Sequence, residues 1–156
     1  MHINFYFKNI NDNPDCRIMI NSQEKYAGPV VDCVTVNSVE LGKNNIQIEF
    51  TNKLPSDTVI NNDGSIVKDK NFELDCIVVD SYSLEELIWQ SHYQAAHGDQ
   101  YSSCLFFGPP GYFEISIENP ILPWILKTKH EKYDNDPDWE TDYNYYITAC
   151  NILKQI

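Results

Sequence analysis

The sequence is poor in positive charge and contains no long apolar run. Its 156 residues include ten lysines and one arginine, Arg17, against 23 acidic residues, and the formal net charge at pH 7 is −12. A surface this acidic repels a phosphate backbone, so nucleic-acid binding is disfavoured. No apolar run approaches the roughly 20 residues of a membrane-spanning helix. We therefore expect neither a nucleic-acid partner nor a membrane partner.

Paired cysteines are also missing. The five cysteines are odd in number, widely separated and never form a C-x-x-C pair: Cys16, Cys33, Cys76, Cys104 and Cys150. This pattern argues against a disulfide framework and against a zinc knuckle. Residues 1–13 show neither the basic start nor the apolar core of a signal peptide. We therefore expect synthesis in a host cytoplasm without export.

Catalytic signatures are absent from the sequence. It contains no G-x-S-x-G nucleophile elbow, phosphate-binding glycine loop, dinucleotide fingerprint or H-E-x-x-H motif. Glu85 and Glu86 are adjacent and would diverge on a helix, whereas the paired carboxylates of a glycosidase must face each other. We therefore expect a protein that is not an enzyme.

The sequence does contain the alternation of apolar and polar residues that is typical of β-strands. Ile3, Phe5 and Phe7 alternate with polar or half-polar neighbours, which is typical of a strand buried on one face. Similar runs rich in valine, isoleucine and aromatic residues occupy 17–20, 32–38, 46–51, 72–80 and 112–118. The Asp63-Gly64 pair suits a tight hairpin turn. The pattern predicts a mainly β protein, a jelly-roll-like antiparallel β-sandwich that forms a single domain over residues 1–156.

Two helices are predicted beside the strands. Ser83 and Glu86 have the spacing of a capping box, which predicts a short helix over the next two turns. Asp136 and Pro137 suit a helix start, so a C-terminal helix is expected over 136–154. Its apolar face would comprise Trp139, Tyr143, Tyr146, Ile147, Cys150 and Leu153. We assign Trp124 and Trp139 to the core.

Oxygen-bearing side chains cluster between two of the expected strands. They are Asn52, Asp57, Asp63, Asp69 and Asn71. Calcium takes six to eight oxygen ligands from such groups, so this set indicates a binding edge organised by Ca²⁺. The alternative is that Asn and Asp form turns and cap the local backbone, and both interpretations stay open.

The same stretch resembles a known family. I-E-F-T-N-K and the later D-K-N-F-E-L-D-C-I-V-V resemble the strand-loop-strand segment of calcium-dependent, xylan-binding-type carbohydrate-binding modules. The resemblance implies a jelly-roll sandwich with a metal that bridges sugar hydroxyls at a loop edge, with Asp69 and Asn71 at matching positions. Lys53 departs from the family pattern, because it replaces an aspartate with a cation.

Aromatic side chains near an irregular segment, 94–111, are the other binding candidates. Flat rings serve as stacking surfaces for sugars or as anchors at protein interfaces. The preferred candidates, which lie in or near this segment, are Trp89, Tyr93, Tyr101 and Tyr112, and we predict that they contact a ligand or a partner.

Three hypotheses on function follow. The sandwich organisation is similar to that of small accessory proteins of tailed bacterial viruses, so the preferred hypothesis is a structural protein of the virion (a decoration, adaptor or tail protein). Its partners would be other virion proteins or copies of itself. The first alternative is a calcium-dependent carbohydrate-binding module with a glycan ligand. The second is an acidic inhibitor that covers the nucleic-acid-binding surface of a host protein.

Overall fold

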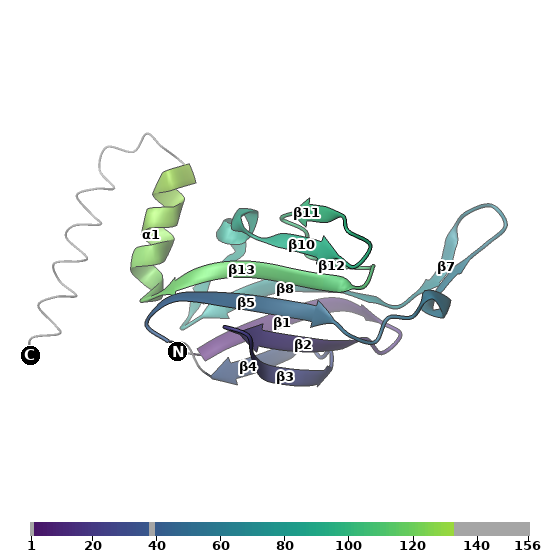
Figure 1. Ribbon diagram of the computed structural model, residues 1–156, viewed down its shortest axis with the longest axis horizontal. Helices are drawn as coiled ribbons and strands as arrows, with labels where there is room; N and C mark the ends of the chain where they lie inside the picture. The colour runs from purple at the N-terminus through teal and green to yellow at the C-terminus, as the bar shows by residue number, and fades with distance from the viewer. Residues whose placement is uncertain (1, 38–39, 133–156) are drawn as a thin grey trace, which may run out of the picture.

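Antiparallel strands in two layers dominate the computed structural model, which describes residues 2–37 and 40–132 (Figure 1). One sheet has the order β12 (Phe106–Phe107), β8 (Asn71–Val79), β1 (His2–Asn11) and β4 (Cys33–Asn37), with β9 (Tyr82–Ser83) also paired to β8. The other has the order β11 (Gln100–Ser102), β10 (His92–Ala95), β13 (Gly111–Asn119), β5 (Gly42–Phe50), β2 (Asp15–Ile20) and β3 (Gln23–Pro29). The predicted antiparallel β-sandwich is confirmed.

A two-stranded hairpin projects from one end of the sandwich. It consists of β6 (Thr58–Ile60) and β7 (Ile66–Asp69), and the short 3-10 helix η1 (Pro55–Asp57) leads into it. Gly64 has a positive φ of 85° and donates its amide N–H to the Asn61 carbonyl over 2.9 Å, so the predicted tight turn is present. Figure 1 shows the hairpin at the opposite end of the sandwich from α1 (Ile121–Lys132).

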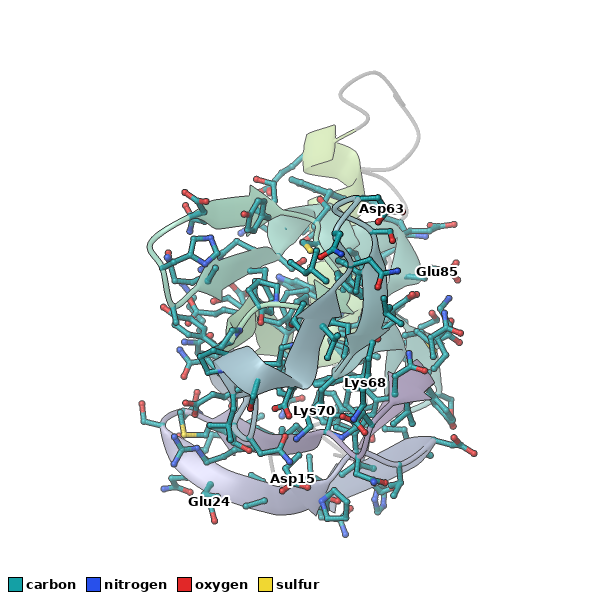
Figure 2. The ribbon with its side chains drawn as sticks, turned by 90° about the vertical axis from the view of Figure 1, so that its right-hand side faces the viewer. Asp15, Glu24, Asp63, Lys68, Lys70 and Glu85 are labelled. Carbon is teal, nitrogen blue, oxygen red and sulfur yellow. The ribbon has the colours of Figure 1, made fainter. Side chains whose placement is uncertain are left out.

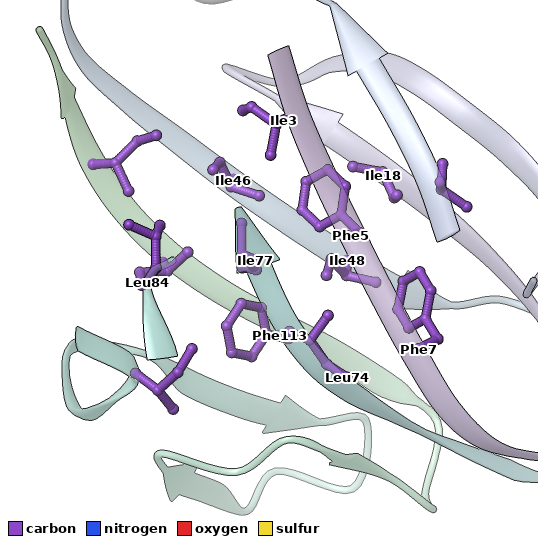
Figure 3. Packing of buried hydrophobic residues seen from close by; sticks show 14 of the residues in the cluster. Ile3, Phe5, Phe7, Ile18, Ile46, Ile48, Leu74, Ile77, Leu84 and Phe113 are labelled. Atoms are coloured by element: carbon purple, nitrogen blue, oxygen red, sulfur yellow. The ribbon is translucent and has the colours of Figure 1, made fainter. Parts of the chain in front are cut away.

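The core lies between the two sheets and follows from the alternation of the strands (Figure 3). In the first sheet, β1 turns Ile3, Phe5 and Phe7 inward, and all three are buried. In the second sheet, Ile48 of β5 lies opposite Phe113 of β13, and both are fully buried. Burying a large apolar side chain stabilises a fold by roughly 1.5–3 kcal/mol, so this core fixes the register of the sheets.

Aromatic rings concentrate at the end of the core nearest the hairpin. Phe72 stacks on Phe107 with ring centroids 4.3 Å apart, and it meets Phe50 edge to face at 5.1 Å. Phe7 makes a further edge contact with Phe72 at 5.6 Å. Phe50 ends β5 and Phe72 lies at the start of β8, so the cluster anchors the two chain segments that lead to and from the hairpin.

The helices differ from the expectation. The short helix is the 3-10 helix η2 (Glu85–Gln90), and Ser83 Oγ accepts the amide N–H of Glu85 at 3.3 Å, so the predicted capping box is corrected. The predicted helix over 136–154, with Trp139, lies outside the described residues. Among residues 2–37 and 40–132, no helix combines the length and apolar character needed to cross a membrane.

The helix α1 was not predicted. Ile121, Trp124, Ile125 and Thr128 recur at helical spacing and are all buried, and the helix packs against β13 and η2. The predicted assignment of Trp124 to the core is confirmed. Pro123 lies in the first turn, where a missing amide N–H costs no helical hydrogen bond.

Candidate binding site at the root of the hairpin

The hairpin root is the place where the chain leaves the sandwich and returns to it; we define it as residues 52–57 and 69–71. Figure 2 views the molecule from the hairpin end and shows Asp63 near the top of the view, with Lys68 and then Lys70 below it. The aromatic cluster holds both ends of this segment. The polar side chains of the root are therefore presented by a fixed part of the core.

Lys53 and Asp69 form the central ion pair of the root. The side chain of Lys53 is only 6% exposed, and its ammonium bonds to the Asp69 carboxylate and donates to the Lys70 carbonyl oxygen at 2.6 Å. Thr58 Oγ1 donates to the same carboxylate oxygen at 2.6 Å. Asn71 donates its side-chain amide to the other oxygen at 2.9 Å. Both oxygens of Asp69 therefore accept hydrogen bonds from the chain itself.

A second ion pair lies beside the first. The ammonium nitrogen of Lys70 is 3.2 Å from a carboxylate oxygen of Asp57, and the Lys70 side chain is 15% exposed. Lys70 also donates to the Asn52 carbonyl oxygen at 3.3 Å. The Leu54 amide N–H donates to the same Asp57 oxygen at 2.8 Å, which closes the first turn of η1. Asp57 therefore serves both as a local cap and as a counter-ion.

These contacts change the acidity of both carboxyl groups. The Leu54 amide, with Lys70, holds the pKa of Asp57 below its ordinary value. Burial raises the pKa of Asp69, but the hydrogen bonds from Asn71, Lys53 and Thr58 outweigh burial and leave its pKa lowered. Both groups are therefore carboxylates at neutral pH.

Four of the five predicted oxygen residues meet at the root and one does not. Asp57, Asp69, Asn71 and the backbone of Asn52 belong to the network described above. The Asn52 side chain turns toward β2 instead, and its oxygen accepts the Asp15 amide N–H at 2.7 Å.

Asp63 is the residue that the structure separates from the others. It lies in the hairpin turn, and one of its oxygens accepts two hydrogen bonds from Ser65, from the amide at 2.9 Å and from the hydroxyl at 2.6 Å. The grouping of Asp63 with the root residues in one ligand set is corrected.

The root residues do not fit a calcium ion in the present arrangement. Calcium requires six to eight oxygens that are free to point at it. The carboxylate oxygens of Asp69, and the one Asp57 oxygen described above, already face donors, two of which are ammonium groups. In the part of the chain that the structure describes, no three or more His, Cys, Asp or Glu side chains are grouped to hold a metal ion.

A pocket of about 420 Å³ opens beside the Lys53–Asp69 pair. One part of its wall comes from the hairpin and its root, and the other comes from β12 and the segment between β12 and β13. Its lining residues are Lys53, Leu54, Pro55, Thr58, Ile66, Asp69, Phe106, Gly108, Pro109 and Pro110. The pocket combines apolar walls with a few polar groups, which is the usual composition of a small-ligand site.

Phe106 is positioned in this pocket by its neighbours in the chain. Phe107, the next residue, is fully buried in the aromatic cluster, and so Phe106 is turned outward and is 45% exposed. A side chain at Gly108 would overlap the Phe106 ring, so glycine is needed for the ring to lie where it does. The sequence F-F-G-P-P-G lies within the irregular segment 94–111. Its exposed aromatic residue beside two prolines is the signal that could have identified this wall.

The four predicted aromatic contact residues do not line the pocket. Tyr93 is fully buried, and its hydroxyl donates to the Pro109 carbonyl oxygen at 2.6 Å, so its assignment to a binding surface is corrected. Tyr112 is half-buried in β13, and Trp89 and Tyr101 are exposed in η2 and β11. Tyr93 contributes indirectly, because its hydrogen bond fixes a proline of the pocket wall.

Comparison with solved structures identifies the architecture. A structure of vCBM60, from work on two families of calcium-dependent carbohydrate-binding modules, matches with a TM-score of 0.50 and 14% identity over 72% of this chain and 87% of that chain. A structure of vCBM60 in complex with galactobiose matches with a TM-score of 0.49 and 14% identity over 73% of this chain and 96% of that chain. No protein-family model and no curated protein matches the chain. The fold is thus a β-sandwich like that of vCBM60.

Proposed function

We propose that this chain is a non-catalytic glycan-binding module and that its site is the pocket at the hairpin root. A sugar ring offers apolar C–H faces and a rim of hydroxyl groups. The observation that carries the proposal is that one pocket contains an exposed aromatic ring, two prolines and the hydrogen-bonding groups of Asp69, Thr58 and Lys53. Aromatic faces cover apolar surface, and carboxylate and ammonium groups bond hydroxyls.

Two further features support a glycan ligand. The sandwich resembles vCBM60, which belongs to a group of carbohydrate-binding modules. The net charge of −12 disfavours polyanionic ligands and leaves neutral glycans acceptable.

Binding to a panel of soluble xylo-, gluco- and galacto-oligosaccharides tests the proposal, with affinity measured by isothermal titration calorimetry. Phe106→Ala removes the aromatic wall, and we expect an increase in Kd of about ten-fold or more, which corresponds to about 1.4 kcal/mol. Tyr101→Ala is the matched control, because Tyr101 is similarly exposed but does not line the pocket. Equal affinities of the two variants, or no binding across the panel, would contradict the proposal.

A second candidate function is protein assembly through the hairpin. Its strands expose four aliphatic side chains, those of Val59, Ile60, Ile66 and Val67. A free two-stranded hairpin is marginally stable in water, and clustered exposed apolar residues mark contact sites. We propose a second copy of the chain as the partner; the virion setting stays a prediction.

Size-exclusion chromatography with light scattering over a range of concentrations tests assembly. Association that Ile66→Lys abolishes would support it, whereas a monomer at all concentrations would count against it. The hypothesis of an acidic inhibitor also stays a prediction, and salt-independent binding to a basic partner would exclude its electrostatic basis.

A further inference from the structure

The two ammonium groups at the hairpin root are unusual because both are largely buried and both join segments that are distant in sequence. The Lys53 ammonium lies between the Asp69 carboxylate and the Lys70 carbonyl oxygen. The Lys70 ammonium lies between the Asp57 carboxylate and the Asn52 carbonyl oxygen. Each therefore ties the segment that enters the hairpin to the segment that leaves it.

This is the arrangement in which a metal ion would organise such an edge. A bound cation gathers carboxylate and carbonyl oxygens from separate loops, and an ammonium group does the same with its three N–H donors. We propose that Lys53 and Lys70 act as internal cations that hold the hairpin root in shape, and that the root is therefore independent of calcium.

The charges support this assignment. Two ammonium groups face two carboxylates, so the root is locally neutral. A calcium ion placed among the same oxygens would have to displace hydrogen bonds to Asp69 and Asp57, and it would meet the two positive charges at short range in a partly dry environment. Binding of calcium is therefore opposed as long as both lysines are present.

The proposal goes beyond glycan binding and concerns how the site is built. Its first test is the melting temperature of the full chain at neutral pH, measured in several millimolar calcium chloride and in EGTA. A ligand of the folded form must raise the melting temperature. We expect melting temperatures that agree within about 1 °C, because no calcium binds under these conditions. A higher melting temperature in calcium chloride than in EGTA, or saturable calcium binding in calorimetry, would overturn the proposal, whatever the glycan experiments show.

The second test removes the internal cation. Lys53→Met keeps the aliphatic stem of the side chain and deletes the charge. Lys68→Met is the matched control, because Lys68 lies on β7 but is 58% exposed and pairs with Asp12 at the surface. Native-state amide hydrogen exchange is read at Lys70, whose amide N–H bonds across the root to the Asp57 carbonyl oxygen, and at Leu54, whose amide N–H bonds to the Asp57 carboxylate within the entering segment.

We expect exchange at these amides to accelerate at least ten-fold, or about 1.4 kcal/mol of lost protection, in Lys53→Met and to stay unchanged in Lys68→Met. If Lys53→Met does not fold, Lys70→Met is used, since Asp57 keeps its bond from the Leu54 backbone in that variant. Equal exchange in the lysine variant and in the control would overturn the proposal.

Discussion

Asp69→Asn is the most informative single change at the hairpin root. The substitution keeps the size of the side chain and removes its negative charge. In the native protein, one carboxylate oxygen faces Lys53 and Thr58 and the other faces Asn71, and all three are donors. An amide has only one acceptor oxygen, so one of its two sides must present N–H groups to a donor.

The size of the effect follows from burial. Removing one partner of a buried ion pair costs about 3–5 kcal/mol, because the other charge is left without a counter-ion. Lys53 keeps its bond to the Lys70 carbonyl oxygen, so the loss falls at the lower end, about 3 kcal/mol. With a urea slope of about 2 kcal/mol per molar, the unfolding midpoint at pH 7 should decrease by about 1.5 M. Circular dichroism in a urea titration measures it.

The loss of stability in Asp69→Asn should also depend on pH, and the shifted pKa of Asp69 sets the direction of that dependence. The pKa of Asp69 is lower in the folded protein than its ordinary value of 3.8, so the unfolded chain binds more protons in acid. The stabilisation by Asp69 is therefore complete above about pH 5 and is lost as the pH falls through the folded-state pKa. The difference between the native protein and the variant should narrow in that range.

Asp63→Asn is the control for this experiment. Asp63 also has a lowered pKa, mainly through the hydrogen bonds from Ser65, but it lies in the hairpin turn and faces no buried ammonium. We expect the urea midpoint of this variant to stay close to that of the native protein. Equal midpoints for Asp69→Asn and the native protein at pH 7, or a difference that widens below pH 4, would refute the reasoning.

Two substitutions and one labelling experiment test other parts of the structure. Gly108→Ala should displace the Phe106 ring and weaken ligand binding in calorimetry, while the melting temperature changes little because that ring is half-exposed. Gly111→Ala would place a methyl group against the β10 backbone and should destabilise the fold by about 1–3 kcal/mol in a urea titration. Burial raises the pKa of the Cys16 thiol to about 12, so a thiol reagent should modify the exposed Cys33 in the native protein and reach Cys16 only after unfolding.

The long central strands could be predicted because each carries its own signal, whereas β3, β10, β11 and β12 were not predicted. Alternation in β1 places Ile3, Phe5 and Phe7 on one face, and the same pattern appears in β8 of the same sheet and in β5 of the facing sheet. The helix α1 could not be predicted in this way, because Pro120 and Pro123 indicate a turn locally. Its helical state depends on burial of Trp124 and its neighbours against η2 and β13, which is a tertiary effect.

The binding site could be predicted only in part, for a related reason. The oxygen-rich loop and the departure at Lys53 are visible in the sequence. Whether these oxygen-bearing side chains bind a metal or pair with lysines depends on the contact of Lys53 with Asp69, sixteen residues away, and on the register of β6 and β7. Phe106, on the other wall of the pocket, is separated from Lys53 by a still longer stretch of sequence. The aromatic residues chosen from sequence included Tyr93, whose hydroxyl serves the wall from inside the core.

We expect the ion pairs and the pocket to be thermodynamically linked, because Lys53 and Asp69 belong both to the root and to the pocket lining. Leu54 and Ile66 belong to the hairpin side, whereas Phe106 and Pro109 belong to the sandwich side, which the buried aromatic cluster holds rigid. The hairpin exposes most of its apolar residues, so its position relative to the sandwich depends on its root. A ligand that touches both walls should stabilise the root, and by reciprocity a weakened root should lower affinity even for a ligand that never contacts a lysine.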